Sequence, residues 1–451
     1  MVERPAGAAD GGPAMTSPMP RSFLFLQGPP GPFFSRLGQA LRGAGHAVHR
    51  VNFHGGDTLA WRAGHAMAFR GRAARWPAWL DAALGRLGIT DVVLFGDCRP
   101  LHQAAARVAR QRGVRVHVFE EGYLRPDWIT LERDGVNGHS SLPRAPQWYR
   151  EQAASLPAPP ALPPIPGDFG ERARAAVRYY LAAYFSWPLF PHYSTHRRWH
   201  PAWESVGWTG RLLRRGRAAR ETAQACARLR AQPYFIFPLQ LDSDFQLRVH
   251  SRFGGLDGAL AHVLESFATH APADCVLAIK AHPLDNGLVD WKRIALHDAR
   301  CLGIANRIAW LDGGDISLLA RGARGMVTVN STSGTLALAA GVPVRTLGTA
   351  VYDMPGLTDQ QKLAAFWRAP RRPDAALFDA FRRVLAERCL LHGGFHNAAA
   401  IDLLIAPACR RLLAAGAPDA AGMSMPATAA TAATAALPPT AASPRTTVPT
   451  P

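Results

Sequence analysis

Residues 275–287, CVLAIKAHPLDNG, decide the expected fold. The apolar run that begins at Cys275 predicts a buried strand, and Lys280 and His282 stand at its end. Pro283 stops a helix from continuing through His282, so the imidazole is expected on a stiff turn. Open α/β folds bind ligands at the carboxyl ends of their strands, and this pattern delivers a cation and an imidazole there. A solvated strand end explains these residues equally well by themselves, and the polar clusters elsewhere favour a ligand site.

The composition limits the class of protein. A chain of 451 residues is too long for one core, so two domains with tails are expected. The net charge of +18 indicates anionic partners, either nucleotide phosphates or an acidic membrane surface, and no motif indicates nucleic acid. The six cysteines show no metal-ligand spacing, which predicts reduced thiols and no metal site. Without a signal-peptide pattern or a spanning apolar run, a cytoplasmic protein is expected.

The first half has the order of a Rossmann-like domain. An apolar strand at 22–26, a Gly/Pro loop at 27–32, a helix and a strand at 47–53 follow one another. The loop lacks the nicotinamide fingerprint. Gly28 fits a plain tight loop, or a loop whose backbone N–H groups face an acceptor or phosphate, which we prefer. Another strand is expected at 91–95, and Arg99 lies in the loop after it.

Two neighbouring carboxylates, Glu120 and Glu121, follow an expected strand at 114–119. Like charges this close raise the pKa of one carboxyl, which is how a protein makes a neutral general acid. A solvated pair in a loop is the alternative. The polar segment 123–140, which contains Arg125, is expected to be a turn-rich loop that lines a cleft.

The second half repeats the alternation of strand, polar turn and helix. A strand at 233–239 ends in QLDSD, which contains Gln240, Asp242 and Asp244. A later strand at 325–329 ends in NSTSG, and its three hydroxyls and one amide exceed what helix capping needs. Such a helix start can bind a phosphate through N–H groups and hydroxyls.

We therefore expect an α/β protein with two Rossmann-like domains that face each other across a cleft. Between them, the aromatic stretch at 179–190 beside the basic cluster at 191–198 predicts a core helix, with docking on a membrane as the alternative. The expected parts are a disordered leader at 1–20, a first domain at 21–215, a second at 216–365, helices at 366–416 and a disordered Ala/Thr/Pro tail at 417–451.

Six segments together resemble the KpsS/LipB type of capsule polysaccharide biosynthesis protein, over residues 22 to roughly 400. The segments are FLFLQGPPGPFFSRL (23–37), FGDCRP (95–100), VFEEGYLRPDWITLE (118–132), FPLQLDSDFQLRVHS (237–251), KAHPLD (280–285) and NSTSGTLAL (330–338). As a set they are specific. The leader and the tail lie outside the resemblance.

The resemblance implies a GT-B glycosyltransferase with an acceptor domain at 21–215 and a nucleotide-sugar domain at 216–365. It implies CMP-Kdo as the donor, where Kdo is 3-deoxy-manno-octulosonic acid, and no cofactor. The first β-linked Kdo would be placed on (lyso)phosphatidylglycerol by a peripheral enzyme at the cytoplasmic face of the inner membrane, near capsule assembly proteins. Retention of configuration is implied, with Glu120 as acid/base and Asp244 as nucleophile. Relatives usually have Glu-Asp-Gly where this chain has Glu-Glu-Gly, so the role of Glu121 stays open.

The remaining site residues divide between the two substrates. No metal is expected, because a nucleoside monophosphate leaves without a bridging diphosphate. An inverting transferase of the CMP-sialic-acid type and a non-catalytic capsule export factor remain as alternatives. The donor-side candidates are Gln240, Lys280, His282, Pro283, Asn330, Ser331, Thr332 and Ser333, and the acceptor-side candidates are Gly28, Arg99 and Arg125.

Overall fold

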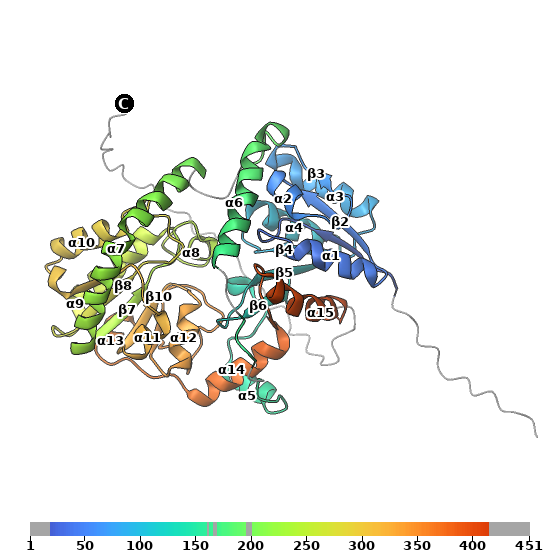
Figure 1. The fold of residues 1–451 in the computed structure, drawn as a ribbon. Helices are drawn as coiled ribbons and strands as arrows, with labels where there is room; N and C mark the ends of the chain where they lie inside the picture. Colours follow the sequence, from blue (N-terminus) through green and yellow to red (C-terminus); the bar gives the residue numbers. More distant parts are fainter. Residues whose placement is uncertain (1–18, 160–161, 166–168, 195–200, 415–451) are drawn as a thin grey trace, which may run out of the picture. The chain divides into compact units, whose positions relative to one another are not determined.

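A computed structural model gives the arrangement of most of the chain (Figure 1). The expected leader, apart from its last two residues, and the expected tail at 417–451 lie outside the described residues. The chain up to Leu412 forms one compact unit. The described residues are 19–159, 162–165, 169–194 and 201–414.

Seven strands form the first sheet. In spatial order they are β12 (Leu390–His392), β6 (Trp128–Arg133), β5 (Arg115–Glu121), β4 (Asp91–Phe95), β1 (Ser22–Phe25), β2 (Ala47–Asn52) and β3 (Met67–Ala68). Strands β1 to β5 pair in parallel, while β6 and β12 are antiparallel additions at one side. The side chains of β1 are all buried, as expected for a parallel strand covered on both faces.

Helices flank this sheet, and the C-terminal part of the chain returns to it. In Figure 1, α15 lies beside the first sheet, and its Arg411 donates from Nη1 to the carbonyl of Leu390 in β12 (2.9 Å). The helices and 3-10 turns of this part are α1 (Phe33–Gly43), α2 (Gly55–Ala60), η1 (Ala73–Arg75), α3 (Trp76–Arg86), α4 (Pro100–Gln111), η2 (Asn137–His139), α5 (Pro146–Ala153), α6 (Phe169–Phe185), η3 (Trp187–Leu189), α14 (Ala375–Arg388) and α15 (Ala398–Ala414).

Five parallel strands form the second sheet, in the order β11 (Val344–Thr346), β10 (Gly325–Thr328), β7 (Tyr234–Pro238), β8 (Val276–Lys280) and β9 (Ile308–Leu311). Strands β7 and β8 are buried along their whole length. The predicted class, α/β with two Rossmann-like sheets, is confirmed. The other elements here are α7 (Pro201–Ala231), α8 (Phe245–Val249), α9 (Leu256–His270), α10 (Trp291–Cys301), η4 (Ala305–Arg307), α11 (Ile316–Arg321), α12 (Ser333–Ala339) and α13 (Leu363–Phe366).

For two segments the predicted secondary structure is wrong. The turn-rich loop expected at 123–140 contains β6, which pairs with β5 in the register Phe119↔Leu131. Ile129 to Glu132 alternate apolar and polar residues as a strand does, but both sets are buried and turn-forming residues such as Pro126 and Gly135 stand on either side. The helical segment expected at 366–416 contains β12, which is too short for a periodic pattern to show.

The aromatic stretch expected to be a core helix is only partly buried. Tyr179 is buried, and its hydroxyl donates to Oδ1 of Asp57 (2.7 Å). Most of the large side chains that follow are exposed, with 75% of Phe185 accessible to solvent, although Phe190 is buried. One face of α6 therefore packs on α2 and the other does not. Among the described residues, no helix is long and apolar enough to span a membrane.

Candidate active site

Each sheet has a point where the strand order reverses, and polar side chains meet there. In the first sheet this point lies between β1 and β4, where Arg99 donates from Nη1 to Oε1 of Gln27 (2.8 Å). In the second sheet it lies between β7 and β10, where Gln240 donates from Nε2 to Oδ1 of Asn330 (2.8 Å). Ligands of open α/β sheets bind in the crevice at such points. Three predicted site residues thus stand at the two expected crevices.

A cavity of about 1820 Å³ is lined by residues that follow strands of both sheets. Single ligand sites are usually about 300–1,000 Å³, so this cavity has room for two substrates. The predicted residues that line it are Arg99, Glu120, Glu121, Asp242 and Asp244. The predicted residues that do not line it are Gly28, Arg125, Gln240, Lys280, His282, Pro283, Asn330, Ser331, Thr332 and Ser333.

Glu120 lies near the carboxyl end of β5 and holds a proton more tightly than an ordinary glutamate. Burial raises its pKa to about 7, and the negative charges of Glu121 and Asp244 add to this effect. Gly96 makes room for its carboxyl, since a Cβ at that position would lie only 3.3 Å from Oε2 of Glu120. Such a carboxyl can both give and take a proton near neutral pH.

The pKa of Glu121 is shifted in the opposite direction. Burial alone would raise its pKa, but the charges of Arg125, Arg172 and His396 outweigh burial and hold the pKa well below its usual range. The Arg125 ion pair is the shortest, with Nη1 2.7 Å from Oε2, and Arg172 and His396 lie 3.5 and 3.6 Å from Oε1. Glu121 is therefore a fixed negative charge that organises basic side chains.

Asp242 and Asp244 belong to the segment between β7 and α8. Asp242 accepts the N–H of Leu256 at the start of α9 (3.3 Å) and lies 3.8 Å from Nη2 of Arg248, which is the role of a capping residue. The charge of Asp244 acts on Glu120, which places the two carboxyls in one electrostatic environment. Asp244 is thus the acidic group of the second sheet that interacts with Glu120.

Lys280 ends β8, and His282 follows on a turn that the exposed Pro283 stiffens. Nδ1 of His282 accepts the N–H of Leu284 (3.1 Å), so the ring proton sits on Nε2. Burial and the charge of Lys280 lower the pKa of His282 to about 4. The imidazole is therefore a neutral hydrogen-bond donor at physiological pH. Burial also lowers the pKa of Lys280.

The hydroxyls at 331–333 are partly used by their own turn. Oγ of Ser331 donates to Oγ of Ser333 (3.0 Å) and accepts the Ser333 N–H (3.1 Å). Thr332 precedes α12 without a side-chain cap. Hydrogen bonds within the turn itself therefore account for part of this group of hydroxyls.

Gly28 has a packing explanation in the structure. A Cβ at this position would lie 2.6 Å from the ring of Phe34, so only glycine fits. Its neighbours Pro29 and Pro30 line the cavity instead. A role of Gly28 itself in binding the acceptor stays a prediction.

Seven basic residues that line the cavity were not predicted. They are Arg172 of α6, Arg211, Arg214, Arg215 and Arg217 of α7, Lys292 of α10, and His396 in the loop before α15. Arg211 donates from Nη1 to the carbonyl of His282 (3.4 Å). These residues approach the predicted site residues only through tertiary packing. No pattern in the sequence therefore identifies them as site residues.

Comparison with known proteins gives a consistent group of relatives. The family described as capsule polysaccharide biosynthesis protein matches residues 90–396. The capsule polysaccharide modification protein LipB of Neisseria meningitidis serogroup A is 38% identical over 384 residues, covering 83% of this chain and 92% of that protein. The capsule polysaccharide export protein KpsS of Escherichia coli is 35% identical over 368 residues, covering 81% and 94%.

Solved structures with a similar fold are more distant. The β-Kdo 2,7 transferase KpsC of Thermosulfurimonas dismutans is 15% identical, covers 87% of this chain and 99% of that chain, and has a TM-score of 0.42. The β-Kdo 2,4 transferase of the same protein is 14% identical, covers 70% and 83%, and has a TM-score of 0.33.

Proposed function

Because the chain belongs to the capsule polysaccharide biosynthesis protein family and is of the KpsS/LipB type, we propose that it is a retaining glycosyltransferase. It moves β-Kdo from CMP-Kdo to a (lyso)phosphatidylglycerol acceptor. One observation carries the proposal: a carboxyl with a pKa of about 7, Glu120, and a carboxylate of the other sheet, Asp244, line one cavity. Retention by two displacements needs one nucleophilic carboxylate and one acid/base carboxyl.

In the first displacement, a carboxylate oxygen of Asp244 attacks the anomeric carbon of Kdo. The bond from that carbon to the phosphate oxygen breaks, and its electron pair leaves with CMP. A phosphate monoester needs no proton to leave. Lys280 and His282 do not line the cavity themselves, but their chain neighbours Ala281 and Leu284 do. The ammonium of Lys280 and the Nε2–H of His282 would stabilise the charge of the leaving phosphate from behind this wall, so the transfer step needs no metal.

In the second displacement, the ionised form of Glu120 accepts the proton of the acceptor hydroxyl. The hydroxyl oxygen attacks the anomeric carbon, and the bond to Asp244 breaks. A base works best when its pKa is near the operating pH, which the raised pKa of Glu120 provides. Two inversions give overall retention. Glu121 holds Arg125 and Arg172 beside the site and takes no proton.

The walls of the cavity support a lipid acceptor. Helices α6 and α7 contribute both apolar and basic side chains to it, a combination that suits an anionic phospholipid. Apolar side chains of these helices are exposed outside the cavity as well. Leu213 of α7 is an example, with 82% of its surface accessible to solvent. This surface supports a peripheral position on the inner membrane. The side chains from these helices that line the cavity include Val177, Leu181, Phe185, Leu212, Arg172, Arg211 and Arg214.

Incubation with CMP-Kdo and a fluorescent (lyso)phosphatidylglycerol, followed by mass spectrometry of lipid and protein, tests the proposal. We expect a Kdo-lipid product with the β configuration by NMR and a Kdo adduct on the peptide that contains Asp244. Asp244→Ala should abolish both, while Asp257→Asn, at the start of α9 and outside the cavity lining, should retain both. An α product would favour the inverting alternative, and absence of CMP binding in calorimetry would favour the non-catalytic export factor.

A further inference from the structure

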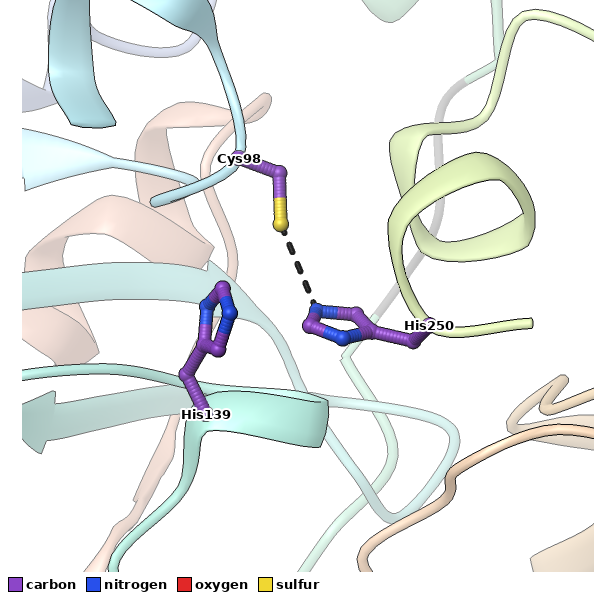
Figure 2. A group of neighbouring side chains, drawn as sticks. All are labelled: Cys98, His139 and His250. Carbon is purple, nitrogen blue, oxygen red and sulfur yellow. Dashed lines mark hydrogen bonds between the residues drawn. The ribbon is translucent and has the colours of Figure 1, made fainter. Parts of the chain in front are cut away.

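A cysteine and two histidines from distant parts of the chain meet beside the cavity (Figure 2). Cys98 follows β4, His139 ends η2, and His250 follows α8 in the second half. One ligand atom from each lies within 4.8 Å of the other two, and Sγ of Cys98 is 3.4 Å from Nε2 of His250. We propose that these three side chains bind a divalent cation of the zinc class that joins the two halves of the protein.

The geometry is close to that of a tetrahedral site. Bonds of about 2.0 Å to nitrogen and about 2.3 Å to sulfur place the ligand atoms of a tetrahedral site roughly 3.3–3.5 Å apart. The pair formed by Cys98 and His250 already has this separation, and since no pair is wider than 4.8 Å, the widest has to close by at most about 1.5 Å. One thiolate and two imidazoles favour zinc over magnesium or calcium, which prefer oxygen ligands.

Asp97 supplies the supporting contact that a metal-binding histidine usually has, since its Oδ2 lies 2.9 Å from Nδ1 of His139. Its Oδ1 accepts the S–H of Cys98 (3.2 Å), a proton that the thiol releases when it binds a cation. The carboxylate is itself fixed by the N–H of Val136 (3.1 Å). A carboxylate bonded to a ligand histidine orients the ring and raises its basicity. Asp97 and Cys98 are buried, while His139 is exposed and gives the ion a path from solvent.

The backbone at Gly138 lies close to the imidazole ring of His250. A Cβ at this position would lie 2.2 Å from Nδ1 of His250, so only glycine lets the ring approach. The close approach is an observation independent of the ligand spacing.

The cation would affect the proposed transferase by holding the segment that contains Asp244 in place. His250 belongs to the same segment as Asp244, and Cys98 lines the cavity together with Glu120. An ion held by Cys98, His139 and His250 fixes the Asp244 segment against the first sheet. It takes no part in the bonds that form and break during transfer.

Titration of the chelator-treated full-length protein with Co²⁺, followed by optical absorption, tests the site directly. We expect one equivalent to bind with a sulfur-to-cobalt charge-transfer band, and Zn²⁺ to displace it. Cys98→Ser should remove the band, and His250→Ala should weaken binding by at least about 100-fold, beyond the usual effect of a supporting residue. Asp97→Asn should weaken it about 10–100-fold.

Cys301→Ser is the matched control. Cys301 is exposed and lies 3.9 Å from Nε2 of His297, so it has a neighbouring histidine but belongs to no three-ligand group among the described residues. It should leave the spectrum unchanged. Gly138→Ala keeps every ligand and should weaken binding by displacing His250. A wild-type protein without the band, or a band that persists in Cys98→Ser, overturns the proposal whatever the transferase assay shows.

Discussion

Replacement of Glu120 by glutamine is expected to stabilise the protein at alkaline pH and to leave it unchanged at acid pH. Burial raises the pKa of Glu120 from 4.5 to about 7. The folded protein therefore holds a proton that the unfolded chain releases above pH 4.5, and its stability falls as the pH rises from 4.5 to 7. Glutamine cannot ionise, so the variant escapes this loss.

The size of the effect follows from the pKa difference. About 2.5 pKa units correspond to about 3.4 kcal/mol for a fully shielded group. Glu120 is only partly buried, and solvent screening reduces the gain to about 1–2 kcal/mol above pH 8. Glutamine keeps the Oε1 that accepts the N–H of Glu121 (3.0 Å), so this hydrogen bond survives.

Urea unfolding at about pH 5 and about pH 8 measures both values. Glu121→Gln is the matched control in the same strand, because its pKa is lowered by basic neighbours. That variant should be destabilised, most strongly at pH 8. Turnover of Glu120→Gln should fall about 10²–10⁴-fold through loss of the acid/base group. A Glu120→Gln protein that gains no stability between pH 5 and pH 8 relative to wild type would refute the reasoning.

Three further outcomes are expected. His282→Ala should weaken CMP binding in calorimetry by about tenfold, because one neutral donor to the phosphate is lost. Phe185→Ser with Leu213→Ser should reduce sedimentation with phosphatidylglycerol vesicles by at least about tenfold, whereas Leu403→Ser, exposed on α15, should not. Thr335→Val should lower the free energy of unfolding by about 1 kcal/mol, since the buried Oγ1 shares its proton between the carbonyls of Thr332 (2.8 Å) and Tyr123 (3.0 Å).

The sequence predicts the parts of the fold in which local pattern and burial agree. Strands β7 and β8 are continuous apolar runs followed by polar turns, and both occur where expected. Strand β6 carries the alternating pattern of a strand over Ile129 to Glu132, but the turn-forming residues on both sides favoured a loop. Its polar residues are buried and bonded: Ser140 donates from Oγ to Oε2 of Glu132 (2.5 Å). A buried carboxyl with its own partner looks the same in the sequence as an exposed one.

The candidate site also has one part that the sequence predicts and another that it does not. Glu120, Asp244 and His282 stand at strand ends, where the topology of parallel sheets makes their grouping predictable. Arg172 comes from a helix whose other arginines face elsewhere, and His139 meets His250 only when the two halves pack. Contacts of this kind depend on the relative placement of distant segments, which no local pattern contains.

The β5–β6 pairing also helps to explain why the pKa values of two adjacent glutamates are shifted in opposite directions. Pairing with β6 extends β5 through both residues, in the register Glu120↔Thr130 and Glu121↔Ile129. Successive side chains of a strand point to opposite faces, so the ladder separates the two carboxyls. Glu121 meets Arg125 and Arg172, while Glu120 lies against Gly96, away from those cations. Burial raises the pKa of Glu120, and the β5–β6 pairing keeps its carboxyl apart from the cations that lower the pKa of Glu121.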